Sequence, residues 1–320
     1  MRLLTLLFCL LATGAAAQDY PTKPVRILVP YGPGGATDII ARIVAAKLTE
    51  SLGQSFVVEN RPGANGNIAL EAAAKAAPDG YTLLVGNVST NAINETIYAH
   101  QLTIRPSRDL IAVTKLVEIP HIVVASAALP ASNIAELIAL AKKEPGKINF
   151  ASVGLGSYPH LDMERFMKAA GVDFTHVPYK GGAGQAIPAM VAGEVQLAFF
   201  NMASLLPHIK SGRLKALAAI PTQRLPELPN VPTLAEQGYP GIGTNAWQGL
   251  FAPAATPKPV VDKLYASVAG ALGRPDQKES LARQMMSVEL SGSPQEFTEL
   301  VRRETQAWGD FLRDARIKID

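Results

Sequence analysis

VPYGPGGATD, from Val29 to Asp38, and VPYKGGAGQA, from Val177 to Ala186, are two versions of one sequence pattern. Each runs from a β-branched segment through Pro-Tyr and a glycine cluster into a helical pattern. A helix start has unpaired backbone N–H groups and the positive end of the helix dipole, and glycine lets a ligand approach that backbone. Such a loop is suited to bind an anion. Because each half of the chain has one, we expect two lobes that face one small acidic ligand.

Segments with strand and helix patterns alternate on both sides of Pro120, which predicts an α/β fold with a mostly parallel sheet flanked by helices in each lobe. The first of them, strand and helix in turn, span residues 25–29, 37–52, 56–58 and 66–76. Extended segments near 118–125 and a Pro- and Gly-rich stretch at 221–243 predict two crossings between the lobes. We therefore expect one lobe at residues 18–120 plus 240–320, the other at residues 121–239, and a ligand cleft between them.

The amino terminus has the pattern of a secretory signal peptide. Arg2 precedes an apolar run from Leu3 to Leu11, and Ala15-Ala16-Ala17 supplies an A-x-A exit. The run is shorter than the ~20 residues that span a bilayer. We therefore expect residues 1–17 to be removed and the mature protein to be periplasmic. Cys9, the single cysteine, lies in this segment, so no disulfide or cysteine-bound metal is expected in the mature chain.

The mature chain is predicted to have nearly balanced charge. Arg2 is the only charged residue of the expected signal peptide, so 29 of the 30 basic residues remain beside 27 acidic ones. They form no basic block, and nucleic acid is not an expected partner.

Sequence patterns of enzymes and metal sites are missing. Neither glycine cluster is followed by the Lys-Ser or Lys-Thr of a phosphate-binding loop, and the dinucleotide pattern G-x-G-x-x-G breaks at Thr37 and Pro159. The five histidines show no metal-ligand spacing. Ser157 and His160 lack the G-x-S-x-G elbow of hydrolases, and their position favours capping and packing. We expect no enzymatic activity, no metal and no cofactor.

Short polar side chains follow three predicted strands, in the segments 85–94, 152–160 and 197–204. In open α/β sheets, ligands bind outside the carboxyl ends of the strands. Each segment alone also fits helix capping, because Ser, Thr and Asn are the preferred cap residues. Together they predict a cleft lined by neutral hydrogen-bond donors.

Six motifs, in this order, resemble one known family: VPYGPGGATD, ENRPGANGN (59–67), SVGLGSYPH (152–160), VPYKGGAGQA, LPNVPTLAEQGYP (228–240) and Trp247 followed by GLFAP. The mature chain resembles the TctC-like solute-binding proteins of tripartite tricarboxylate transporters, also called Bug receptors. The resemblance implies a two-lobed periplasmic-binding-protein fold of type II that closes on a small carboxylate. It also implies transfer to a membrane permease of one large and one small subunit, with the receptor itself expected to be a monomer.

The resemblance also implies which residues bind the ligand, partly through bridging water. From the first lobe they would be Tyr31, which covers the ligand, backbone donors at Gly34, Gly35 and Ala36, the water-anchoring loop at Ala64, and Thr90 and Asn91. From the second lobe they would be Gly156, Ser157, His160, Tyr179, Gly181 and Asn201. Asp38 is expected to fix the first helix and its loop without contacting the ligand.

None of these loops contributes an arginine, and Lys180 is the only cation adjoining one. A carboxylate would therefore be held by N–H groups, hydroxyls, water and helix dipoles. Phe200 stands where a number of relatives have an acid or a small polar residue, which argues against amino-acid ligands unless Phe200 faces the core. Asn65 replaces a common glycine at the expected water site.

The ligand's identity stays open at this stage, because dicarboxylates, tricarboxylates and aromatic or nicotinate-like acids all fit a carboxylate site. Two alternatives to transport also remain. One is a sensory role, in which the liganded protein docks on a membrane sensor. The other, more distant, is a secreted hydrolase that uses Ser157 and His160.

Overall fold

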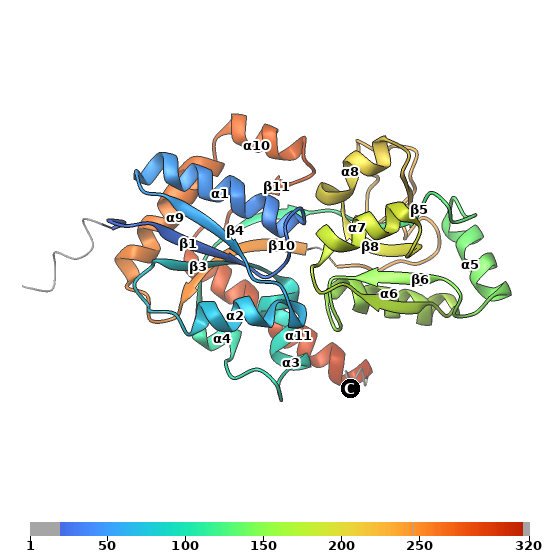
Figure 1. Cartoon of the computed structure of the whole chain (residues 1–320), viewed down its shortest axis with the longest axis horizontal. Coiled ribbons are helices and arrows are strands. Elements are labelled where there is room, and N and C mark those ends of the chain that lie inside the picture. Colours follow the sequence, from blue (N-terminus) through green and yellow to red (C-terminus); the bar gives the residue numbers. More distant parts are fainter. Residues whose placement is uncertain (1–19, 245, 316–320) are drawn as a thin grey trace, which may run out of the picture.

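The computed structural model describes residues 20–244 and 246–315, so the expected signal peptide lies outside the described residues. Its first sheet has six strands in the order β11-β4-β10-β3-β1-β2 (Figure 1). Strand β1 pairs in parallel with β2 and β3, whereas β10 runs antiparallel to both β3 and β4. The strands are β1 (Val25–Val29), β2 (Phe56–Asn60), β3 (Thr82–Asn87), β4 (Leu110–Ile119), β10 (Ala246–Pro253) and β11 (Ser287–Val288).

The second sheet has five strands in the order β7-β6-β8-β5-β9. Strand β6 is parallel to β7 and β8, and β5 is antiparallel to β8 and β9. The strands are β5 (His121–Ser126), β6 (Asn149–Ser152), β7 (Thr175–Pro178), β8 (Leu197–Asn201) and β9 (Leu214–Ala219).

The two sheets repeat one topology. In the first sheet β10 lies antiparallel beside β3, and in the second sheet β5 lies antiparallel beside β8. The chain enters each of these strands from the other sheet, from β9 into β10 and from β4 into β5. Strands β1 to β4 and strands β6 to β9 each run in one direction. The predicted α/β fold with two mostly parallel lobes is therefore confirmed.

The chain crosses between the sheets twice. Strand β4 ends at Ile119 and β5 begins at His121, so Pro120 alone separates them, whereas the return from β9 to β10 is long. Strand β10 was not predicted from the sequence, because it has no β-branched residue and Gln248 and Gly249 interrupt its apolar pattern. The exact residues at which one lobe ends and the other begins stay a prediction.

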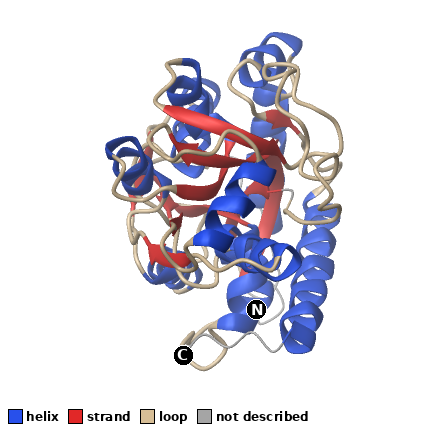
Figure 2. Ribbon diagram, turned by 90° about the vertical axis from the view of Figure 1, so that its right-hand side faces the viewer, coloured by secondary structure: helices blue, strands red, loops and turns tan. Residues whose placement is uncertain are grey.

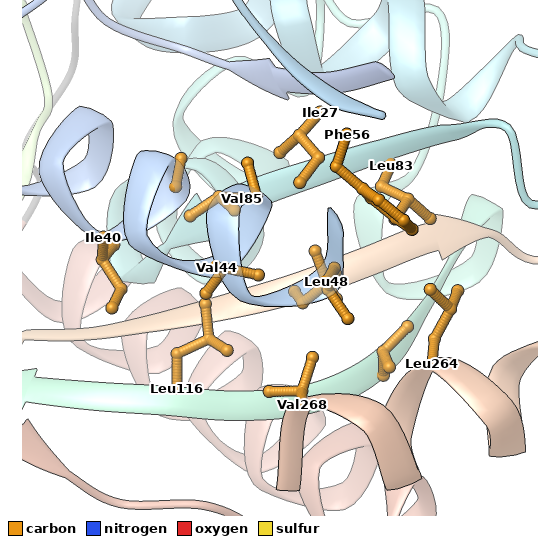
Figure 3. Close-up of a cluster of buried hydrophobic side chains, with 14 of the residues drawn as sticks. Ile27, Ile40, Val44, Leu48, Phe56, Leu83, Val85, Leu116, Leu264 and Val268 are labelled. Atoms are coloured by element: carbon orange, nitrogen blue, oxygen red, sulfur yellow. The ribbon is translucent and has the colours of Figure 1, made fainter. Parts of the chain in front are cut away.

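The core of the first lobe lies on both faces of its sheet. On one face, Ile40, Val44 and Leu48 of α1 pack against the sheet and against Leu264 of α9 (Figure 3). On the other face, α2 and α11 cover the sheet, with Trp247 fully buried. Burial of each large apolar side chain is worth about 1.5–3 kcal/mol, so these layers make a firm base for the loops after β1 and β3. The helices are α1 (Ala36–Leu52), α2 (Asn67–Ala74), α9 (Lys258–Leu272) and α11 (Pro294–Ala315).

The second lobe is built in the same way, with α5 and α6 on one face of its sheet and α7 and α8 on the other. Seen from the side of this lobe, the strands lie inside and the helices outside (Figure 2). Phe200 is 2% exposed in the cluster under α7 and α8, so it faces the core and its identity says nothing about the ligand. The helices are α5 (Ile134–Lys143), α6 (Tyr158–Ala170), α7 (Ala183–Ala192) and α8 (Met202–Lys210).

Three short helices complete the described chain: α3 (Asn94–Ile97), α4 (Pro106–Asp109) and α10 (Pro275–Ala282). A 3₁₀ turn at Ala64–Gly66 and a π-helical turn at Ser89–Ile93 lie beside the lobe boundary. Among the described residues, no helix combines the length and the apolar character needed to cross a membrane.

Candidate functional site

The two loops that share the VPY–glycine pattern meet at the boundary between the lobes. The Gly32 N–H donates to the Gly181 carbonyl over 2.9 Å. A Cβ atom on Gly184 would lie 1.9 Å from the Pro33 carbonyl oxygen, and one on Gly32 would lie 2.8 Å from the Gly181 oxygen. The backbones are therefore in direct contact, and only glycine permits this approach.

Asp38 holds the first loop in place. Its carboxylate accepts hydrogen bonds from the Gly34 N–H at 3.0 Å, from Arg42 Nε at 3.0 Å and from Asn60 Nδ2 at 2.9 Å. Burial opposes ionisation, but the bonds from Arg42, Asn60 and Gly34 hold the pKa of Asp38 below its usual value. The carboxylate is thus occupied within its own lobe, which is the geometry of a loop anchor.

The start of α1 leaves buried donors unused. Gly35 is the N-cap, and Ala36 and Thr37 begin the helix with 2% and 5% exposure. Within the described part of the chain, the N–H groups of Ala36 and Thr37 donate to no protein acceptor. Together with the helix dipole they form a donor site of the kind that binds an anion.

Two buried side-chain atoms beside this loop also have no hydrogen-bond partner in the described residues: the Tyr31 hydroxyl and Asn65 Oδ1. Burial raises the pKa of Tyr31 to about 12, which nearby Asn87 and Ser89 partly offset. Asn65 packs on the second lobe, since a Cβ on Gly154 would lie 3.1 Å from its Cα. Buried polar groups usually find a partner, so these atoms mark a place where a ligand or water would be bound.

The polar side chains after β3 are paired among themselves. The Thr90 hydroxyl donates to Asn91 Oδ1 at 2.7 Å, and Asn87 Oδ1 accepts from the Ser89 N–H at 2.9 Å. A Cβ on Gly86 would lie 1.9 Å from Asn91 Oδ1. The side chains of Thr90 and Asn91 are therefore engaged within the first lobe, where they stabilise the turn.

The start of α6 reaches the first lobe. The Tyr158 N–H donates to Ser89 Oγ at 3.1 Å, and the Tyr98 hydroxyl donates to the Leu155 carbonyl at 2.6 Å. Leu161 packs into the same apolar cluster as Trp247 of the first lobe. The helix that opens with SYPH is therefore part of the contact between lobes.

Ser157 and His160 do not form a nucleophile–base pair. Ser157 Oγ donates to the Gly154 carbonyl at 2.7 Å, and His160 Nδ1 accepts from the Gly156 N–H at 3.1 Å. Each side chain is thus engaged with the loop backbone. The expected ligand contacts of Gly156 and His160 stay a prediction, and here the two residues are hydrogen-bonded to each other.

A stack of aromatic rings packs beside the loop that carries Gly156. The ring centroids of His160 and His176 are 4.0 Å apart, and His176 stacks on Phe150 at 4.8 Å. Burial and the neighbouring His160 lower the pKa of His176 to about 3, so it stays neutral. Its Nε2 lies 2.7 Å from Ser152 Oγ. The stack fixes the loop that carries Gly156.

A buried network ties both crossings of the chain to α6. Tyr158 hydroxyl lies 2.8 Å from His121 Nε2, and His121 Nδ1 lies 2.9 Å from the Thr244 carbonyl. The carbonyl requires Nδ1 to carry the proton, so Nε2 accepts from Tyr158. Thr244 in turn donates to Asp162 through its N–H at 2.8 Å and its hydroxyl at 2.9 Å. Residues on either side of the lobe boundary are therefore fixed to one helix.

The titrating groups of this network have shifted pKa values. Burial lowers the pKa of His121 to about 4, against the opposing bond to Thr244. Burial raises the pKa of Asp162 to about 7, although Thr244 and Arg165 favour its charged form. Sequence reasoning missed Tyr158, His121 and Asp162, because a Tyr after a helix cap and a His after Pro120 fit ordinary packing equally well.

Asn201 and Tyr179 lie on the second lobe. Asn201 is the N-cap residue of α8, accepts a hydrogen bond from Ser204 Oγ at 3.2 Å and lies beside the buried Tyr158 hydroxyl. The Tyr179 ring is half-buried and packs against the apolar cluster under α7. In the described ranges, no three His, Cys, Asp or Glu side chains gather as metal ligands would.

Comparison with known proteins identifies the family. The model of the "Tripartite tricarboxylate transporter family receptor" matches residues 40–317. This chain belongs to that family. It is 34% identical to the protein BugT of Bordetella pertussis over 309 residues, which cover 97% of this chain and 94% of BugT. The resemblance predicted from the six motifs is therefore confirmed.

Two solved structures of this receptor type carry ligands. "R. palustris Rpa4515 with adipate" is 34% identical, with a TM-score of 0.88 over 93% of this chain and 99% of that one. MatC from Rhodopseudomonas palustris with bound malate is 34% identical, with a TM-score of 0.85 over 91% and 99% of the two chains. The family consists of periplasmic solute-binding receptors and not of enzymes, and the present protein is a solute-binding receptor of this kind.

Proposed function

We propose that this receptor captures a small organic carboxylate between its two lobes and delivers it to a membrane permease of one large and one small subunit. The observation that carries the proposal is the buried start of α1, beside the loop that contacts the second lobe, where N–H groups find no acceptor among the described residues. The adipate and malate of the two related structures support a carboxylate ligand.

The carboxylate would be held without a counter-ion. Lys180, the one cationic residue in the sequences of the two loops, is exposed to solvent. Hydrogen bonds from neutral donors to a charged acceptor are stronger than those between neutral groups. The donors of a helix start are already ordered, so binding orders little more of the protein. Affinity then depends on the closure that excludes water from the loops.

The ligand-binding residues that we propose remain those expected from the family. In the first lobe they are Tyr31, Gly34, Gly35, Ala36, Ala64, Thr90 and Asn91. In the second lobe they are Gly156, Ser157, His160, Tyr179, Gly181 and Asn201. The expected signal peptide would direct the chain to the periplasm, where we expect it to act as a monomer.

A thermal-shift screen of organic acids with the mature protein tests ligand capture. A ligand that binds only the folded state at 100 times its Kd adds about 2.7 kcal/mol to the free energy of unfolding. We expect several di- or tricarboxylates to raise the melting temperature, and amines and sugars to leave it unchanged. A screen in which no carboxylate raises it contradicts the proposal.

Delivery is tested separately, with the permease reconstituted in vesicles. Addition of the loaded receptor should start uptake of the labelled carboxylate, whereas the free acid at the same concentration should not. Equal uptake with and without the receptor would leave capture in place and remove delivery.

A further inference from the structure

Gln248 is a fully buried polar residue that the established family features do not explain. It lies in β10, and its Oε1 accepts a hydrogen bond from the Thr37 hydroxyl at 2.8 Å. Its Nε2 has no hydrogen-bond partner among the described residues, and the side chain is 0% exposed. A buried amide N–H without a partner destabilises the protein, so this group is a candidate for binding something outside the chain.

The strand pairing places Gln248 at the same edge of the sheet as the ligand loops. Gln248 lies directly opposite Asn87, the last residue of β3. On the other side of β3 lies β1, and Tyr31, two residues past the end of β1, has its hydroxyl near Asn87 and Ser89. Asn87 therefore has Gln248 as its neighbour on one side and the Tyr31 hydroxyl close by.

Thr37 connects Gln248 to the start of α1. It is the second residue of the helix whose first N–H groups have no acceptor in the described part of the chain, and its hydroxyl donates to the Gln248 amide oxygen. Gln248 Nε2 therefore belongs to the same donor group as the helix start. The Tyr31 hydroxyl is a second donor, beside Asn87 and Ser89 and near Tyr158 of the second lobe.

We infer that Gln248 and Tyr31 determine which carboxylates bind. Gln248 Nε2 donates to the ligand carboxylate at the start of α1, and the Tyr31 hydroxyl donates to a second oxygen acceptor on the same ligand. The preferred ligand thus carries a carboxylate and, separated from it, a second carboxylate or a hydroxyl group. This inference rests on the proposed function and assigns residues to the two ends of its ligand.

The first test compares acids that differ only at one end, by isothermal titration calorimetry. The pairs are succinate with butanoate and adipate with hexanoate. We expect the native protein to prefer the diacid of the pair it binds best by about tenfold or more, the worth of one hydrogen bond to a charged group. Tyr31→Phe should remove most of that preference by weakening the diacid, while the monoacid binds within about twofold.

The second test uses an isosteric change at Gln248. Gln248→Glu keeps an oxygen for the Thr37 hydroxyl but replaces the free N–H₂ with a second oxygen, which is negatively charged when ionised. We expect both acids of a pair to lose about 100-fold or more in affinity, because a donor becomes a repelling acceptor. Gln101→Glu adds the same charge at an exposed position and should bind like the native protein.

A purely structural role would give a different result. The melting temperature of ligand-free Tyr31→Phe should stay the same or rise, because the lost hydroxyl has no partner. A clear fall would show that the hydroxyl stabilises the fold and would overturn its assignment. Unchanged affinities in Tyr31→Phe and Gln248→Glu would overturn the inference while the proposed function stands. If the native protein binds none of the acids, the proposed function itself fails.

Discussion

The loop from Val29 to Asp38 and the loop from Val177 to Ala186 share a sequence pattern but use their backbones differently. The first loop leads into buried N–H groups that have no protein acceptor among the described residues. In the second loop, the Gly181 N–H donates to Gln185 Oε1 at 3.0 Å and the Gly182 N–H donates to the Tyr179 carbonyl at 2.9 Å. The first loop therefore leads to hydrogen-bond donors that a ligand can use. The second loop supplies a glycine backbone against which the first loop packs.

The two loops also differ in what fixes them. Asp38 ends the first pattern and bonds to Gly34, Arg42 and Asn60 of its own lobe. The corresponding residue of the second pattern is Ala186, which is buried in the apolar cluster under α7. The same motif is therefore held by a charge network in one lobe and by apolar packing in the other. A shared sequence pattern predicts a shared backbone shape more reliably than a shared role.

The largest effect is expected from Gly184→Ala. Its Cβ would lie 1.9 Å from the Pro33 oxygen, so the lobes cannot close as they do here. Ligand affinity should fall about 100-fold, a cost typical of overpacking a tight contact. The melting temperature of the ligand-free protein should hardly change, because Gly184 lies in α7. Titration calorimetry measures the first effect and thermal unfolding the second.

Gly270→Ala is the matched control, since a Cβ there would meet no atom within 4 Å. Its affinity should equal that of the native protein. If Gly184→Ala binds within threefold of the native protein, the second loop is not the closing surface.

The next effect concerns pH and the network that ties both crossings to α6. The pKa of Asp162 is raised to about 7 by burial, so the unfolded chain loses this proton first and stability falls as the pH rises toward 7. Asp162→Asn removes this loss. Relative to the native protein, its free energy of unfolding should rise by about 2 kcal/mol between pH 5 and pH 7.

The lowered pKa of His121 has the opposite effect on the pH dependence of stability. Its pKa is lowered to about 4, so its contribution to stability is lost as the pH falls below 6.5. The Asp162→Asn variant should therefore become steadily more stable from pH 4 to pH 6.5 in urea titrations. Asp262→Asn, at an exposed ion pair, is the control. A variant-to-native difference that does not change with pH would refute the assignment of Asp162.

A smaller effect is expected from Asp38→Asn. The neutral side chain cannot accept all three hydrogen bonds, so the free energy of unfolding should fall by about 1 kcal/mol. Affinity should fall roughly tenfold, because the first loop is no longer fixed before binding. Chemical denaturation and calorimetry measure both. A loss of stability without any loss of affinity would show that the loop needs no anchor.

The smallest effect is expected from Tyr179→Phe. The half-buried ring packs on its own lobe, and its hydroxyl has no part in the contact between Gly32 and Gly181. Affinity should change by less than about threefold, because the substitution keeps the ring that we propose to contact the ligand and removes only a hydroxyl, whose value is that of one weak hydrogen bond. A tenfold loss would make the second loop a donor to the ligand and weaken the contrast between the loops.

The fold was predictable from the sequence because its signals are local. Apolar periodicity located the strand at Val25–Val29 and the helix that starts near Ala36, and Pro120 marked the first crossing. The resemblance of six motifs then gave the family. Strand β10 was missed, since its pairing with β3 and β4 depends on residues more than 100 positions away.

The site was predictable only in outline. Both glycine loops do meet, but the sequence does not tell that Gly184 rests on Pro33 or that Gly156 donates to His160. Gln248 lies between Trp247 and GLFAP of the last motif, but its hydrogen bond with Thr37 follows from the packing of β10 and α1. Relations of this kind arise from tertiary packing, which short sequence patterns do not encode.

A crystal structure of the receptor with its best-binding carboxylate tests the proposed ligand site at the start of α1. We expect a carboxylate oxygen about 2.7–3.1 Å from the N–H groups of Ala36 or Thr37, the usual length of such bonds. We also expect that Gly32 and Gly184 keep their contact with the opposite loop. A carboxylate bound instead to the N–H groups at the start of α7, away from α1, would contradict the division of roles between the two loops.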